Sequence, residues 1–311
     1  MKTYSLFLGA ALVMALTSCS QNDGVCHLDE KKSEVRFTSN IITMSPATRA
    51  AGNTWDGNDK IGVYMLEKES TSVVNEMSNV QHITETGGSA GSFKAVDEII
   101  YFPDNGKEVR FMAYYPYKSD VIGDGDIYKV DVTNQNSQAK IDLLYSFKTD
   151  AVFEKTVSEK VVPLEFNHML TKLIVNIKAG EGLESSDLAG IKIHFEGLNS
   201  TADFNLFSGS LSNHAGSANI VPLSGIAPGG YVANFESILI PTDAVPNARI
   251  VFDLNNAHED ISSDVFMWSF DKELVKSTKH TYNVTINRTG IEVKATIIDW
   301  LNGGEDSIIA E

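Results

Sequence analysis

The sequence predicts an all-β fold, and three features of its 311 residues lead to that prediction. Short runs alternate apolar and polar side chains, as strands with one buried face do. Glycine pairs separate these runs and favour tight turns, because glycine accepts positive φ without steric cost. No long stretch repeats with the 3.6-residue period of a helix, and no βαβ alternation occurs. We therefore expect antiparallel β-sandwiches, two of them in so long a chain.

The apolar alternation places strands on both sides of a charged segment at 149–160, which lacks a sustained apolar pattern. The first domain is accordingly expected at residues 35–158 and the second at 159–311. The expected strands are 35–37, 61–66 and 109–115, then 161–166, 173–178, 191–195, 282–286 and 291–295.

The N-terminus predicts export and lipid attachment. Lys2 precedes an apolar run from Leu6 to Leu16, which spans only about half of a bilayer core at about 1.5 Å per residue. We therefore interpret residues 1–18 as a signal peptide. The residues that end in Cys19 resemble a bacterial lipobox, which predicts an acylated (palmitate-type) Cys19 that anchors the chain to a lipid membrane. A polar tether, residues 19–34, follows.

Charge and cysteine content exclude several classes of protein. The chain has 25 Lys and Arg against 41 Asp and Glu, a formal net charge of −16, so phosphate backbones would be repelled and no nucleic-acid partner is expected. Only two cysteines, Cys19 and Cys26, are present. That number rules out a disulfide-dense scaffold and a multi-cysteine zinc site.

No segment of the sequence fully matches a catalytic or metal-binding motif. Residues 87–91 match the GxSxG pattern of serine hydrolases, but a strand-like run follows where the pattern needs a helix. The segment 56–61 begins like a calcium loop, yet Lys60 and Ile61 stand where a ligand and a glycine belong. His168 is interpreted as a structural histidine. We expect no catalytic, cofactor or metal site, and so no enzyme.

Six motifs along the chain, in this order, resemble the fimbrillin family, the lipoprotein precursors of type V pili in anaerobic Gram-negative bacteria. They are Thr48-Arg49-Ala50, residues 55–64, Tyr114-Tyr115-Pro116-Tyr117, residues 142–146, residues 166–173 and residues 297–303.

The resemblance implies two transthyretin-like β-sandwich domains in tandem and an assembly step triggered by proteolysis. In the family an arginine-specific protease removes the lipidated N-terminal segment with its first strand, and a strand of another pilus subunit fills the vacated groove. In this sequence the cut falls between Arg49 and Ala50. The small, polar residues 45–53, broken by a proline, fit an exposed cleavable loop. The implied location is the outer membrane, then the fimbrium.

The first expected strand carries Val35, Phe37 and Ile41 on one side, with Ser39 as a polar break. Burying three large apolar side chains is worth roughly 5 to 9 kcal/mol.

The last expected strand has apolar residues on one face until both faces become apolar near its end. That change is typical of a strand that meets a second surface. The segment is therefore either a donor strand for the next subunit or a plug of its own domain, and both remain open. The residues concerned are Ile291, Val293, Ala295, Ile297, Ile298 and Trp300.

The function expected from these features is that of a structural subunit or minor component of a cell-surface fimbria. The alternative is a lipid-anchored surface binding protein, of glycan- or adhesin-type, that never polymerises.

Overall fold

The chain folds into strands, as expected of an all-β protein. The computed structural model describes residues 32–41, 54–121, 126–147, 153, 160–243, 247–254, 265–269, 273–299 and 308–310. The strands in the first part are β1 (Val35–Ile41), β2 (Lys60–Glu67), β3 (Val80–Thr84), β4 (Ala90–Ala95), β5 (Val109–Tyr115), β6 (Ile127–Asp131), β7 (Leu144–Phe147) and β8 (Lys160–His168). Those that follow are β9 (Thr171–Ala179), β10 (Lys192–Glu196), β11 (Thr201–Asn205), β12 (Ser210–Ala215), β13 (Leu223–Ser224), β14 (Ala233–Leu239), β15 (Arg249–Asp253), β16 (Val265–Ser269), β17 (Thr278–Asn287), β18 (Gly290–Asp299) and β19 (Ile308–Ala310). Two short 3₁₀ helices, η1 (Gln138–Lys140) and η2 (Ser185–Leu188), are also present.

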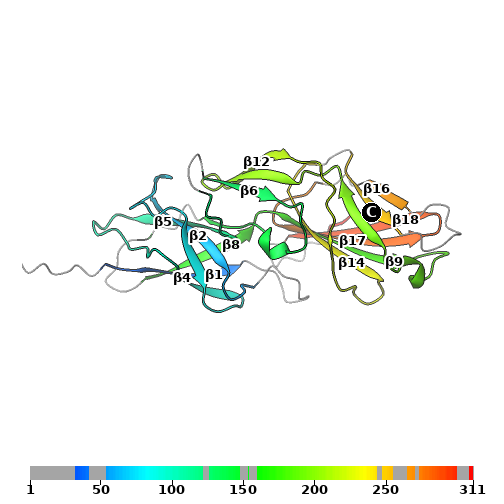
Figure 1. The fold of residues 1–311 in the computed structure, drawn as a ribbon, viewed down its shortest axis with the longest axis horizontal. Coiled ribbons are helices and arrows are strands. Elements are labelled where there is room, and N and C mark those ends of the chain that lie inside the picture. The colour runs from blue at the N-terminus through cyan, green and yellow to red at the C-terminus, as the bar shows by residue number, and fades with distance from the viewer. Residues whose placement is uncertain are drawn as a thin grey trace, which may run out of the picture. The chain divides into compact units, whose positions relative to one another are not determined.

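The first eight strands, β6 excepted, form a closed barrel in the order β1-β4-β3-β2-β5-β7-β8 (Figure 1). The remaining strands form a six-stranded sheet, β13-β14-β9-β17-β18-β19, and two three-stranded sheets, β10-β15-β16 and β12-β11-β6. In β2 and β5 both faces are buried. Their alternate side chains enter two different cores, one inside the barrel and one shared with the later sheets. This double burial explains why both strands are largely apolar, with Arg110 as the one charged residue of β5 and charges only at the two ends of β2.

The all-β prediction is confirmed, but the sheets differ from purely antiparallel sandwiches. The first sheet closes into a barrel, and two strand pairs are parallel, β1 with β8 and β9 with β17. Both parallel pairs join strands that are far apart in the sequence. Hairpin neighbours must be antiparallel, whereas distant strands are free of that constraint.

The expected boundary near 149–160 stays a prediction. β8 begins at the end of this segment and pairs with β1 and β7 in the barrel. β9 follows β8 directly in the sequence and lies in the six-stranded sheet. β6 pairs with β11 from the later part of the chain.

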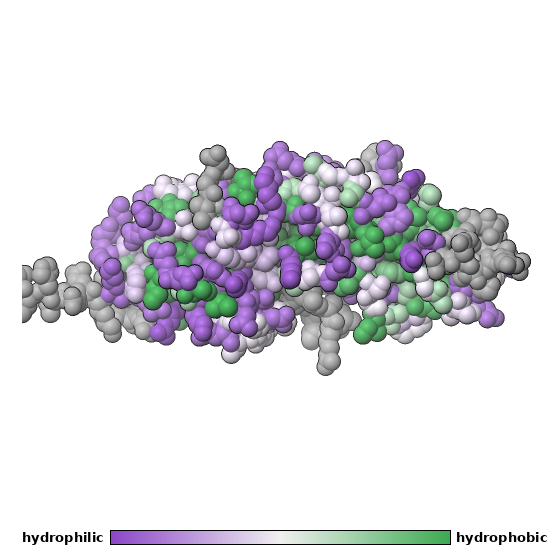
Figure 2. Space-filling model, in the orientation of Figure 1, coloured by the Kyte–Doolittle hydropathy of each residue, from purple (hydrophilic) through white to green (hydrophobic). Residues whose placement is uncertain are grey.

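Polar and apolar residues mix on the surface shown in Figure 2, with an apolar area over β16. This strand lies at the edge of its sheet, and its Met267 side chain is 58% exposed. Exposed apolar residues on edge strands are typical of surfaces that other chains contact. Within the described residues, no helix has the length and apolarity needed to cross a bilayer.

Candidate functional site: strand β1 and the groove it fills

Strand β1 completes the barrel by pairing along both of its edges. It runs antiparallel to β4, with Phe37 opposite Phe93, and parallel to β8, with Ile41 opposite Phe166 (Figure 1). Removing β1 would therefore leave two strands with an unpaired edge each. Such edges readily accept another extended segment.

The inner face of β1 is buried in the barrel core. Val35, Phe37, Ser39 and Ile41 are buried, whereas the residues between them are exposed. The Phe37 ring meets His82 and Phe111 edge-on, with 5.1 Å between ring centroids in each pair. Fully burying each large apolar side chain is worth about 1.5 to 3 kcal/mol, so β1 closes the barrel firmly.

The residues before β1 are also attached. The backbone N–H of Val35 donates to the carbonyl of Ile100 at 2.9 Å, and that of Phe102 donates to the carbonyl of Ser33 at 3.0 Å. The Lys32 ammonium lies 5.8 Å from the centroid of the Tyr101 ring. The attached segment therefore includes residues 32–34 as well as the strand itself.

The chain leaves the barrel after Ile41 and is fixed again at Trp55. The N–H of Trp55 donates to the carbonyl of Gly88, and the N–H of Gly88 donates back, each at 2.8 Å. Ile41 and Trp55 both line a cavity of about 110 Å³. The predicted cleavage bond lies between these two fixed points.

Arg49 and Ala50 themselves are outside the described residues, as are Cys19 and Trp300. Their predicted roles stay predictions.

His82 shows how completely β1 shields the barrel core. Burial lowers the pKa of its imidazole to about 4, although a contact with the Val80 carbonyl acts in the opposite direction. Phe37 of β1 supplies one of the surfaces that cover it. Loss of β1 would therefore expose this side chain to water.

The C-terminal candidate strand belongs to the six-stranded sheet in this structure. β18 pairs antiparallel with β17 along its whole length, from Asp299 opposite Thr278 to Gly290 opposite Asn287. β19 pairs with its residues 295–297 on the other side. A donor role would require β18 to separate from β17.

The motifs dismissed in the sequence take structural roles. β4 begins at Ala90, so the GxSxG segment leads into a strand. The segment at 56–59 is a turn in which the N–H of Asp56 donates to the Asp59 carboxylate at 2.8 Å. His168 is buried, with its Nδ1 atom 3.0 Å from the Asp142 carboxylate. No group of three His, Cys, Asp or Glu side chains is placed to hold a metal among the residues described.

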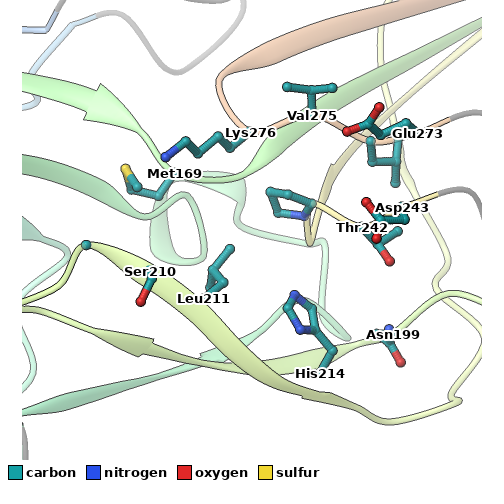
Figure 3. A pocket seen from close by; sticks show the side chains of 13 residues that line it. Met169, Asn199, Ser210, Leu211, His214, Thr242, Asp243, Glu273, Val275 and Lys276 are labelled. Atoms are coloured by element: carbon teal, nitrogen blue, oxygen red, sulfur yellow. The ribbon is translucent and has the colours of Figure 1, made fainter.

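A larger, open cavity of about 550 Å³ has no β1 residue in its described lining (Figure 3). The lining includes the buried side chains of Met169 and Leu274 together with several polar side chains. The lining residues are Met169, Asn199, Gly209, Ser210, Leu211, His214, Pro241, Thr242, Asp243, Glu273, Leu274, Val275 and Lys276. Among the described residues of this lining there is no Trp, Tyr or Phe of the kind that stacks on sugar rings.

The protein is thus an all-β protein in which β1 pairs with β4 and β8 along its two edges. Its covalent link to the residues that follow is the segment at 42–53. Residues 48–300 match the family described as Fimbrillin-like, and the chain belongs to that family. It is the family that the six sequence motifs resemble.

Relatives extend over most or all of the chain. The chain is 29% identical to the "Putative fimbrium subunit Fim1C" of Bacteroides uniformis, over an alignment of 322 positions that covers both proteins completely. A crystal structure of "a putative cell adhesion protein" from the same species is 28% identical, with a TM-score of 0.69 over 87% of this chain and 98% of that one. Another structure so described, from Bacteroides ovatus, has a TM-score of 0.67 at 22% identity, covers 87% and 99% of the two chains, and shows the fold alone.

Proposed function

We propose that the chain is a structural subunit or minor component of a cell-surface fimbria that assembles by donor-strand exchange. The observation that carries the proposal is the place of β1. It closes the barrel between β4 and β8, and the segment at 42–53 is its covalent link to the residues that follow. A single cut in that segment would break this link and leave the other described strands uncut. The fimbrillin-like family supports a role among other fimbrial subunits at the cell surface.

The sequence of events follows from this geometry. An arginine-specific protease cuts between Arg49 and Ala50, and the fragment that leaves takes the acylated Cys19 and β1 with it. The unpaired edges of β4 and β8 and the apolar barrel core then face water, which favours association. A strand of another subunit fills the groove. The two proposed transthyretin-like domains remain joined in the mature subunit.

The donor we propose is residues 291–297 of a neighbouring copy. Ile291, Val293, Ala295 and Ile297 repeat at the spacing of Val35, Phe37, Ser39 and Ile41, the inward positions of β1. The alternative is that this segment only completes its own sheet, as β18 does here.

The test of the proposal begins with cleavage. Limited trypsin digestion of the purified chain should give a new N-terminus at Ala50-Ala51-Gly52, followed by oligomers in size-exclusion chromatography. Arg49→Ala should stay a monomer under the same conditions. Arg49→Lys is the matched control, because trypsin cuts after lysine and an arginine-specific protease does not.

A cut chain that stays monomeric would contradict assembly and favour the alternative, a lipid-anchored binding protein of glycan- or adhesin-type. A first cut elsewhere, with residues 35–48 retained in filaments, would contradict the maturation step.

Cysteine pairs test the donor. Thr38 lies opposite Ser92 in the β1–β4 ladder, and the proposed register places Lys294 where Thr38 was. Both native cysteines lie before residue 50, so the cut chain has a cysteine-free background. Ser92→Cys with Lys294→Cys should form a disulfide between subunits only after cleavage. Ser92→Cys with Glu292→Cys, two residues out of register, is the control. Absence of the Ser92–Lys294 disulfide from the cut, assembled chain would support the alternative, in which the segment only completes its own sheet.

The lipid anchor has its own test. Cells supplied with a clickable fatty acid should label the wild-type chain, and Cys19→Ala should abolish the label and the retention in the outer-membrane fraction. Undiminished labelling of the variant would contradict the anchor.

A further inference from the structure

Ser39 is the polar residue among the four inward positions of β1, and it is poorly matched to its surroundings. Its side chain is only 2% exposed, yet its hydroxyl has no hydrogen-bond partner among the protein atoms described. The neighbouring Trp55 is 1% exposed, and its indole N–H also lacks a hydrogen-bond partner among the residues described. Two buried polar groups therefore lie in this part of the barrel core unsatisfied.

The space around Ser39 is small. Gly91 of β4 lies directly opposite it in the ladder. A Cβ atom added to Gly91 would lie 2.9 Å from Cδ1 of Trp55, 3.2 Å from the Ser39 hydroxyl and 3.3 Å from the Phe93 ring. Trp55 and Ser39 therefore both crowd the space in which a side chain at Gly91 would begin. A side chain much larger than serine at the third inward position would have to displace the indole.

The Trp55 indole is itself held in place. Its ring meets Phe93, Tyr115 and Phe166 edge-on, with 5.1, 5.4 and 5.1 Å between centroids. Phe93 and Phe166 lie on the two strands that flank β1, so this wall belongs to the groove and not to its occupant. The limit on side-chain size therefore persists when β1 leaves.

The hydroxyl makes serine an inferior occupant of this space. A buried hydroxyl without a partner costs about 1–3 kcal/mol in desolvation, whereas a methyl group of nearly the same size carries no such penalty. Alanine fits the available space without the unpaired group. Large side chains meet Trp55 and the Gly91 backbone instead.

We propose that Ser39, Trp55, Gly91 and Phe93 mark a subsite that selects a small apolar side chain at the third inward position of whatever strand fills the groove. The ligand is an extended segment of a second copy of this chain, with large apolar residues at the first, second and fourth positions. This inference rests on the proposed strand exchange, in which Ala295 takes the third position. β1 is then a deliberately weaker occupant than its replacement.

The subsite is testable in the uncut, full-length chain, where assembly plays no part. Ser39→Ala should raise the equilibrium constant for folding about tenfold in urea denaturation, because the unpaired hydroxyl is removed. Ser39→Leu should lower it by more than tenfold. Thr38→Ala, on the exposed face of the same strand, is the matched control and should change it less than threefold. An unchanged or lower constant for Ser39→Ala, or a wild-type constant for Ser39→Leu, would overturn the proposal.

Peptides test the same subsite in the groove itself. Synthetic peptides of residues 33–43 with Ala, Ser or Leu at position 39 are added to the chain cut at Arg49, and their dissociation constants are measured. The expected order of affinity is Ala, then Ser, then Leu, with about tenfold between the first two. Equal affinities contradict the subsite even if the cut chain polymerises. The expected order in a cut chain that never polymerises supports the subsite and contradicts the proposed function.

Discussion

Strands β1 and β17 occupy similar places in their sheets but differ in whether their buried polar side chains are hydrogen-bonded. Each lies between one parallel and one antiparallel neighbour, β8 and β4 for β1, β9 and β18 for β17. In β17 the buried Thr278 hydroxyl lies 2.9 Å from Nε2 of His280 and also donates to the Val275 carbonyl. In β1 the buried Ser39 hydroxyl has no partner among the described residues.

Under the proposed strand exchange, this difference is the one expected between a strand that stays in place and a strand that is replaced. In β17 the buried Thr278 hydroxyl and both ring nitrogens of His280 have hydrogen-bond partners. These hydrogen bonds fix the strand in one place. β1 contributes apolar burial without that fixation. Strong burial keeps the uncut barrel closed, and in the proposed exchange the mismatch at Ser39 would favour displacement of β1 by a better-matched strand after cleavage.

The largest expected effect comes from the aromatic anchor of β1. Phe37→Ala should lower the free energy of unfolding of the uncut chain by about 3–5 kcal/mol, because its ring packs in the closed core. Once the N-terminal fragment has left the chain cut at Arg49, the variant and the wild type should be identical. Urea denaturation measures both states.

Ile286→Ala in β17 is the matched control for that experiment. It should cost about 2–5 kcal/mol in the cut and the uncut chain alike, because β17 remains in place. A Phe37→Ala effect that persists after the fragment has left would contradict the distinction between the two strands.

Two buried histidines give the next largest effect. Burial lowers the pKa of His82, beside β1, and that of His280, in β17, to about 4 each. The unfolded chain binds a proton at each site near its ordinary pKa of 6.5, so stability falls as pH drops from 6.5 towards 4. At pH 5 each site accounts for a loss of about 2 kcal/mol.

Cleavage should separate these histidines. In an NMR titration of the cut chain, with its groove empty, the pKa of His82 should rise towards 6.5, while that of His280 stays near 4. Equal values for His82 before and after loss of β1 would show that another segment shields it.

The sequence predicted strands and their buried faces more readily than their partners. Alternation placed Val35, Phe37 and Ile41 on one side of a strand, and the structure has them buried together. Alternation carries no information about which distant strand lies alongside. The parallel pairing of β1 with β8, and hence the closed barrel, was out of reach for that reason.

The candidate site was only partly visible for a similar reason. The sequence shows Ser39 as a break in the apolar stripe, but its unpaired hydroxyl depends on Trp55 and Gly91, which approach it only after folding. A glycine within a strand often marks such a close approach, and Gly91 was the available signal.

The smallest expected effect sharpens the contrast between the two hydroxyls. Thr278→Val removes a satisfied hydroxyl and should lower the free energy of unfolding by about 0.5–1.5 kcal/mol, equally in the cut and the uncut chain. The effect has the opposite sign to that of Ser39→Ala. Urea denaturation of the single variants measures it, and a stabilised Thr278→Val would remove the contrast.

Hydrogen exchange of the assembled, cut chain tests most directly whether a strand of another subunit replaces β1. We expect the amides of β4 and β8 to exchange slowly in the assembled protein, while mass spectrometry finds residues 1–49 gone. We also expect fast exchange of these amides in cut monomers held apart by dilution. Slow exchange with the fragment of residues 35–49 still bound, or fast exchange in the assembled protein, would contradict strand replacement.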